Sequence, residues 1–227
     1  IKRGTGLPRL NERLTVPFPA AVAGKIIKMA NNSAFGVYLI LLTGTLVLLR
    51  KYAATDDISV GMPVLKQKEV AGYLNNMLII RQTLKGSDSF RECLLAVQKT
   101  VNEANEHQNF PFDALLKLLN INTGESRNFL DVVVMLENIH DRNIVADFQP
   151  KAFFEFGLKD TAIELKLDYQ AALYQKQTVI TLTKRLINLL DKVTGTPGLK
   201  LAELSILASE EQQMILHEFN DTRRDYD

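Results

Sequence analysis

The segment from Phe35 to Leu49 is the longest apolar run of the chain, and it constrains the fold more than any other feature. Four glycine and threonine residues interrupt the run, and it falls short of the roughly 20 residues that span a bilayer. Ser33 can cap a helix here, and the pattern continues to about Tyr52. Because this helix is apolar on nearly every side, we predict that it is buried at the centre of a domain, not inserted in a membrane.

The chain has 227 residues, which is enough for one large domain or two small ones. Apolar residues make up 46% of the sequence and charged residues 23%, as in an ordinary globular protein. The net charge of +1 favours neither nucleic acid nor an anionic membrane as a partner. Cys93 is the single cysteine and lies on the core face of a predicted helix, so no disulfide framework forms and a cytoplasmic location fits best.

Strand and helix patterns alternate along the chain, which predicts an α/β fold with a mixed sheet flanked by helices. Residues 138–152 show no periodic pattern. The long helix at 89–107 opens with a capping box formed by Ser89 and Glu92. The predicted strands cover residues 10–18, 58–65, 77–81, 130–136 and 161–169, and the other predicted helices cover 22–30, 34–52, 111–119, 176–193 and a short stretch after 209.

Few residues offer catalytic chemistry. No Gly-x-Ser-x-Gly elbow is present, and the three histidines lack the spacing of metal ligands, so we predict no metal site. His140 follows a strand in a polar loop, and His217 lies in the last helix. His107 stands at the boundary between two helices in a distinctive segment, but a lone histidine is more often structural than catalytic.

Five short segments in a fixed order resemble the C-terminal half of a condensation domain from nonribosomal peptide synthetases. Residues 107–113, His-Gln-Asn-Phe-Pro-Phe-Asp, are similar to that family's His-Gln-Asp-Tyr-Pro-Phe-Glu motif. The other four are Val-Gly-Met-Pro-Val at 60–64, Gly-Tyr-Leu-Asn-Asn-Met-Leu-Ile-Ile-Arg at 72–81, Ser-Arg-Asn at 126–128 and Phe-Asn-Asp-Thr at 219–222. Met77 stands where the family usually has Thr, and Phe129 where Pro is common, which leaves the subtype open.

The resemblance implies a lobe like chloramphenicol acetyltransferase, one of two that enclose a tunnel. Residues 1–207 would form this C-terminal lobe, and residues 208–227 would be a linker toward a following adenylation domain. The family's catalytic His-His-x-x-x-Asp-Gly signature belongs to the other lobe and does not occur here. The family joins carrier-bound acyl or peptidyl and aminoacyl thioesters through an amide bond, so we expect an enzyme fragment that is inactive alone.

The resemblance also assigns roles to particular residues. Asn75, Asn76 and Arg81 become candidate tunnel-lining residues, although Asn76 is equally a strand-end backbone cap and Arg81 is more often a structural ion-pair partner. His107 is expected to fix the corner between two helices. The remaining residues of the matched motifs are expected to be structural: Gly72, Gln108, Pro111, Phe112, Ser126, Arg127 and Asn128.

The implied partners are the N-terminal lobe, peptidyl carrier domains and an adenylation domain, with neither nucleic acid nor membrane. No cofactor is expected to bind directly, because the phosphopantetheine arms belong to the carrier domains. Two other interpretations stay open. The chain also fits a non-catalytic, condensation-like interaction module, or one lobe of an epimerisation domain. Because it does not begin with Met, we expect it to be a fragment of a longer protein.

Overall fold

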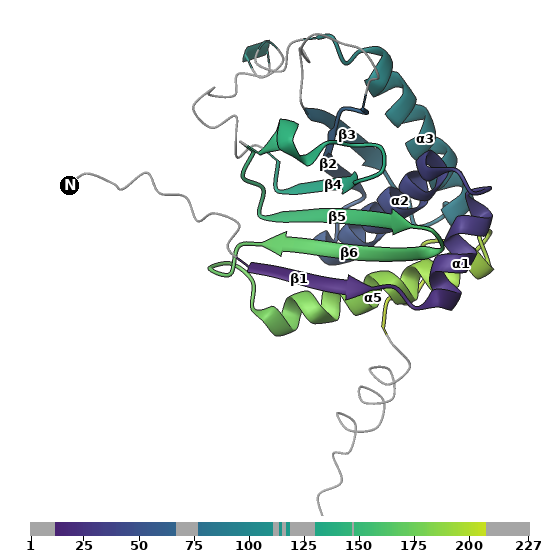
Figure 1. Cartoon of the computed structure of the whole chain (residues 1–227). Helices are drawn as coiled ribbons and strands as arrows, with labels where there is room; N and C mark the ends of the chain where they lie inside the picture. Colours follow the sequence, from purple (N-terminus) through teal and green to yellow (C-terminus); the bar gives the residue numbers. More distant parts are fainter. Residues whose placement is uncertain are drawn as a thin grey trace, which may run out of the picture.

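The computed structural model describes residues 12–66, 77–110, 114, 117–118, 130–146 and 148–207. Its helices pack behind a twisted sheet that crosses the molecule (Figure 1). The elements, in chain order, are β1 (Glu12–Pro17), α1 (Ala20–Met29), α2 (Ala34–Ala53), β2 (Asp57–Pro63), β3 (Met77–Thr83), α3 (Phe90–Glu106), β4 (Val132–Leu136), the 3₁₀ helix η2 (Arg142–Val145), β5 (Ala152–Lys159), β6 (Ala162–Tyr169) and α5 (Lys176–Gly195).

The strands described form one six-stranded sheet in the order β1-β6-β5-β4-β2-β3. The pairs β2–β4 and β4–β5 are parallel, and the others are antiparallel. This confirms the predicted mixed α/β sheet with flanking helices. β1 therefore closes one edge of the described sheet against β6, with Arg13 opposite Asp168.

α2 is the central helix, as its all-round apolar sequence predicts. It is long and apolar enough to cross a membrane by composition alone, but it packs as a core helix, with its residues from Val37 to Leu48 buried. Two inward threonines, Thr43 and Thr45, satisfy their hydroxyls by donating to carbonyls one turn earlier. Ser33 accepts a hydrogen bond from the Gly36 amide, which confirms the predicted cap.

The two faces of the sheet are covered by apolar clusters of different size. On the helix side, one large apolar cluster extends from Phe18 to Leu204. On the opposite side, a smaller cluster that includes Val133, Met135 and Phe153 lies under η2 and its flanking loop. The rest of that opposite face, over β1, β6 and the end of β5, is polar.

Most predicted boundaries agree with the structure within a few residues. The capping box at Ser89 is confirmed, and α3 ends at Glu106 with His107 as its C-cap. One element was not predicted. The sequence predicts no strand between residues 138 and 160, whereas β5 covers Ala152–Lys159. The predicted terminal helix after residue 209 and most of the helix at 111–119 lie outside the described residues.

Candidate functional site

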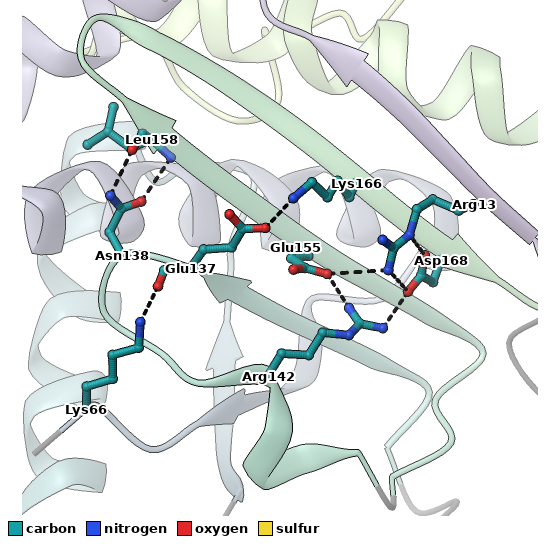
Figure 2. Close-up of polar contacts among 9 residues, drawn as sticks. All are labelled: Arg13, Lys66, Glu137, Asn138, Arg142, Glu155, Leu158, Lys166 and Asp168. Atoms are coloured by element: carbon teal, nitrogen blue, oxygen red, sulfur yellow. Dashed lines mark hydrogen bonds and ion pairs between the residues drawn. The ribbon is translucent and has the colours of Figure 1, made fainter.

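Four charged side chains meet on the polar face of the sheet (Figure 2). Arg13 of β1 places its Nε 2.5 Å and its Nη2 2.9 Å from the two carboxylate oxygens of Asp168 on β6. Arg142 of η2 donates to both Asp168 and Glu155 of β5. We call Arg13, Arg142, Glu155 and Asp168 the four-charge cluster. Its two carboxylates are more than nine-tenths buried, whereas both arginines remain partly open to solvent.

A second group of charges continues the cluster along the sheet. Lys166 of β6 contacts Glu137, which follows β4, at 2.5 Å. Lys66 donates to the backbone carbonyl of the same Glu137 at 2.6 Å. Gly157 makes room for this arrangement, since a Cβ at that position would lie 3.1 Å from the Glu137 carboxylate. A polar strip thus extends from β1 across β6 and β5 to the end of β2.

Burial and charge act in opposite directions on these carboxylates. Burial alone would raise the pKa of Asp168, but hydrogen bonds and charge from Arg13 and Arg142 outweigh it and hold that pKa below its usual value. Glu155 shows the other outcome. Burial and the neighbouring Glu137 raise the pKa of Glu155, and the arginines only partly offset them. Both carboxylates are engaged by arginines, so the cluster is a set of ion pairs that joins β1 and η2 to β5 and β6.

The cluster fixes two otherwise peripheral segments to the sheet. Arg13 ties the edge strand β1 to β6, and Arg142 ties η2 to β5 and β6. The Arg142 guanidinium also lies 4.4 Å from the centroid of the Phe153 ring, which joins the polar strip to the smaller apolar cluster. This face of the sheet is therefore a charged surface whose side chains are held in position by their own contacts.

His140 lies next to the polar strip but is not exposed to it. The sequence predicts that this residue lies in a polar loop, yet it is buried in the structure, with only 1% of its surface exposed. Its Nδ1 lies 3.0 Å from the Leu136 amide nitrogen and 3.2 Å from the Leu136 carbonyl oxygen, while its Nε2 has no hydrogen-bond partner among the described residues. Its ring meets Tyr38 of α2 edge-on, with centroids 4.6 Å apart. His140 is a structural residue that supports the turn after β4.

Arg81, a candidate tunnel-lining residue, forms an ion pair with Asp57 of the neighbouring strand. Its side chain is 72% exposed and the pair joins β3 to β2. The hydrogen bonds to Asp57 raise the pKa of Arg81, as expected for a surface ion pair. This contact matches the structural alternative that the sequence analysis kept open for Arg81.

His107 and Gln108 end α3 through their backbones. The His107 amide donates to the Glu103 carbonyl at 3.1 Å, and the His107 carbonyl accepts from the Phe110 amide at 3.0 Å. The Gln108 amide donates to Asn105. His107 thus takes part in the predicted turn at the end of α3. Cys93 is buried, as predicted, and burial raises the pKa of its thiol to about 11, which makes it unreactive.

The other candidates lie outside the described residues and remain predictions: Gly72, Asn75, Asn76, Pro111, Phe112, Ser126, Arg127 and Asn128. The residue directly after Asn76 is among the described residues. It is Met77, which begins β3 and is buried in the smaller apolar cluster.

Sequence reasoning missed the four-charge cluster entirely. Its members are separated by up to 155 positions in the chain, so no local motif contains them. One signal was present in the sequence. Asp168 alternates with the apolar residues of a predicted strand, which placed it on the face opposite the core, although not beside a partner.

Solved structures share this arrangement of sheet and helices. The first condensation domain of the CDA synthetase matches with a TM-score of 0.70 at 15% identity, over 91% of this chain and 50% of that one. The X-domain solved in complex with OxyB from teicoplanin biosynthesis matches with a TM-score of 0.74 at 20% identity, over 92% of this chain and 51% of that one. The fold is therefore that of condensation and related domains.

The sequence itself gives the family. The model of the condensation domain family matches residues 8–216, and the chain belongs to that family. It is 30% identical to gramicidin S synthase 2 of Brevibacillus brevis over 234 aligned residues, which are 95% of this chain and 5% of that protein. It is 29% identical to bacitracin synthase 2 of Bacillus licheniformis, over 95% of this chain and 9% of that protein. The chain thus spans a small part of these relatives.

Proposed function

We propose that the chain is the C-terminal lobe of a condensation domain that forms amide bonds between carrier-bound thioesters in nonribosomal peptide synthesis. The observation that supports the proposal is the share of a solved condensation domain that this chain covers. The chain aligns over 91% of itself with a solved condensation domain but covers only 50% of that domain. One lobe of a two-lobed domain has this proportion, and the sequence lacks the catalytic signature of the other lobe.

In this proposal the chain supplies a wall of the tunnel and binds no cofactor of its own. Carrier domains would bring the phosphopantetheine arms, and an adenylation domain would follow the linker at 208–227. The side-chain amide of Asn76 would hydrogen-bond a thioester carbonyl or a pantetheine amide without a change of charge. The cytoplasm, where acyl and aminoacyl thioesters are made, is the proposed location.

The first test asks whether the chain needs the other lobe. We expect no amide product above the uncatalysed background when the chain alone meets acyl-loaded and aminoacyl-loaded carrier domains. Product should appear once the N-terminal lobe with its His-His-x-x-x-Asp-Gly signature is co-expressed, since a positioned base is worth about 10² to 10⁴ in rate. Mass spectrometry of the carrier-bound product measures both. Amide formation by the chain alone would overturn the one-lobe assignment.

The second test concerns Asn76 in the complete synthetase. Asn76→Ala should slow condensation while the melting temperature changes little, because one hydrogen bond to substrate is lost. Asn138→Ala is the matched control, since Asn138 binds both the amide and the carbonyl of Leu158 at 2.9 and 2.8 Å and is structural. That control should lower the melting temperature and leave turnover per folded molecule unchanged. The reverse pattern for Asn76 would remove it from the tunnel.

A non-catalytic interaction module is the second candidate, because one solved structure with this fold is an X-domain in complex with a second protein, OxyB. The TM-score to the X-domain bound to OxyB is 0.74, and that to a four-domain nonribosomal peptide synthetase bound to AMP and glycine is also 0.74. Absence of product from the co-expressed lobes, each shown to be folded, would favour this second role.

A further inference from the structure

A cavity of about 180 Å³ lies on the helix side of the sheet, away from the polar strip. The last turns of α2 and the first turns of α5 form one wall, and β4, β5 and β6 form the other. Its lining residues from the sheet include Val132, Ala152 and Phe154, and those from α5 include Thr178 and Leu182. Aliphatic and aromatic carbon therefore surrounds the space.

The mouth of the cavity is made of two aromatic rings that face water. Tyr52 is 42% exposed and Tyr174 is 37% exposed, although large aromatic side chains are usually well covered in a folded chain. Both line the cavity. Exposed rings at the opening of an apolar hollow provide an entry path as well as a surface that gains from contact with an apolar ligand.

Specific contacts hold this mouth in place. Arg185 of α5 lies 5.7 Å from the centroid of the Tyr52 ring and donates to its hydroxyl at 2.9 Å. The loop that carries Tyr174 is pinned by Gln170, which is buried and donates from its side-chain amide to the Pro150 carbonyl at 3.1 Å. The opening is thus part of the fold and does not depend on a chance side-chain orientation.

The lining also defines the chemistry of a ligand. None of the described lining residues is charged, and Tyr169, the most deeply buried tyrosine among them, already donates its hydroxyl to Glu12. A cationic ligand would lose its hydration without gaining a counter-charge, because the charged group nearest the mouth is itself a cation, Arg185. An apolar cavity of about 150 Å³ in another protein stays dry and binds benzene, so the space here suits one substituted ring.

We propose that this cavity is a binding site for a small neutral apolar molecule of about the size of toluene. Recognition would come from shape and apolar contact alone. The site is separated by the sheet from the polar strip, so the proposal does not depend on the condensation function.

The test titrates toluene into the chain and follows its melting temperature and the NMR signals of the lining residues. Toluene should raise the melting temperature and shift those signals, whereas benzylammonium, of similar shape but positively charged, should do neither at the same concentration. Ala152→Ile fills the cavity from the sheet, and Thr178→Leu fills it from α5. Each should weaken toluene binding at least tenfold.

Ala162→Ile is the matched control, because it makes the same change at the exposed far end of the same hairpin. It should leave toluene binding unchanged. Thr178 is exposed, so its variant should fold even if the Ala152 variant does not. No response of the native chain to toluene would overturn the proposal. An equal response in the native chain and in a folded filling variant would also overturn it, because toluene would then bind elsewhere.

Discussion

At the scale of single residues, Arg142 is the side chain on which two buried carboxylates depend. Replacing it with Leu would leave Glu155 without its closest cation and Asp168 with Arg13 alone. We expect Arg142→Leu to lower the free energy of unfolding by about 2 kcal/mol, below the usual cost of breaking a fully buried pair because Arg142 is partly exposed. Arg81→Leu, at an exposed pair, should barely change it. Urea denaturation of both variants measures the difference, and equal losses would contradict the assigned role of Arg142.

His140 gives the fold a dependence on pH. Burial lowers the pKa of His140 from 6.5 to about 4, against a weaker opposing effect from the Leu136 backbone, and the charge of Lys66 adds to the lowering. The neutral form is therefore favoured in the folded state. Its contribution to stability is complete above pH 6.5 and disappears as the pH falls toward 4, where the loss reaches on the order of 3 kcal/mol.

A variant isolates this contribution. In His140→Asn, the side-chain oxygen can still accept from the Leu136 amide but does not titrate. We expect the free energy of unfolding of the native chain to fall more steeply than that of the variant between pH 6.5 and 4.5. Denaturation series at several pH values measure the two slopes. Parallel slopes would show that His140 is not the titrating group.

At the scale of elements, the helices differ in how closely they approach their neighbours. Gly44 in α2 faces α5, where a Cβ would lie 2.6 Å from Cδ2 of the fully buried Leu190. A Cβ added to Gly24 in α1 would have no atom within 4 Å, apart from its chain neighbours and the backbone of its own helix. Both are interior helical positions, where alanine is favoured over glycine by about 0.5 to 1 kcal/mol.

We therefore expect substitution by alanine to change the free energy of unfolding in opposite directions at these two glycines. Gly24→Ala should raise the free energy of unfolding by about 0.5 to 1 kcal/mol. Gly44→Ala should lower it by about 1 to 3 kcal/mol, because Leu190 must move within a packed core. Thermal and chemical denaturation of the pair measure both signs. Stabilisation by Gly44→Ala would mean that α2 and α5 pack less closely than described.

How well an element could be predicted depends on whether its sequence is periodic. α2, α3 and β6 show clear apolar patterns or caps, and their predicted bounds match. β5 does not, because Phe153 points into the smaller apolar cluster while Phe154 and Phe156 point into the main one. Apolar residues on both faces erase the alternation of a half-buried strand. The burial of His140 and the meeting of Arg13 with Asp168 depend on distant packing, which no local pattern encodes.

At the scale of the whole molecule, the main apolar cluster draws on residues from Phe18 to Leu204 and joins all the long helices to the sheet. We therefore expect residues 10–207 to unfold in a single cooperative transition. Calorimetry should give equal van't Hoff and calorimetric enthalpies. Two separated transitions would instead show that the β1–α1 end and the remaining sheet are independent units.

The position of β1 at the edge of the sheet also affects how the protein is made. β1 leaves the ribosome well before its partner β6, which lies about 150 positions later in the chain. At roughly 5 to 20 residues per second, synthesis keeps the two apart for on the order of 10 to 30 s. Until then β1 has no strand to join, and when β6 emerges its outer edge is briefly open. The alternating Glu164, Lys166 and Asp168 of β6 place charge along that open edge, which discourages pairing with a neighbouring nascent chain.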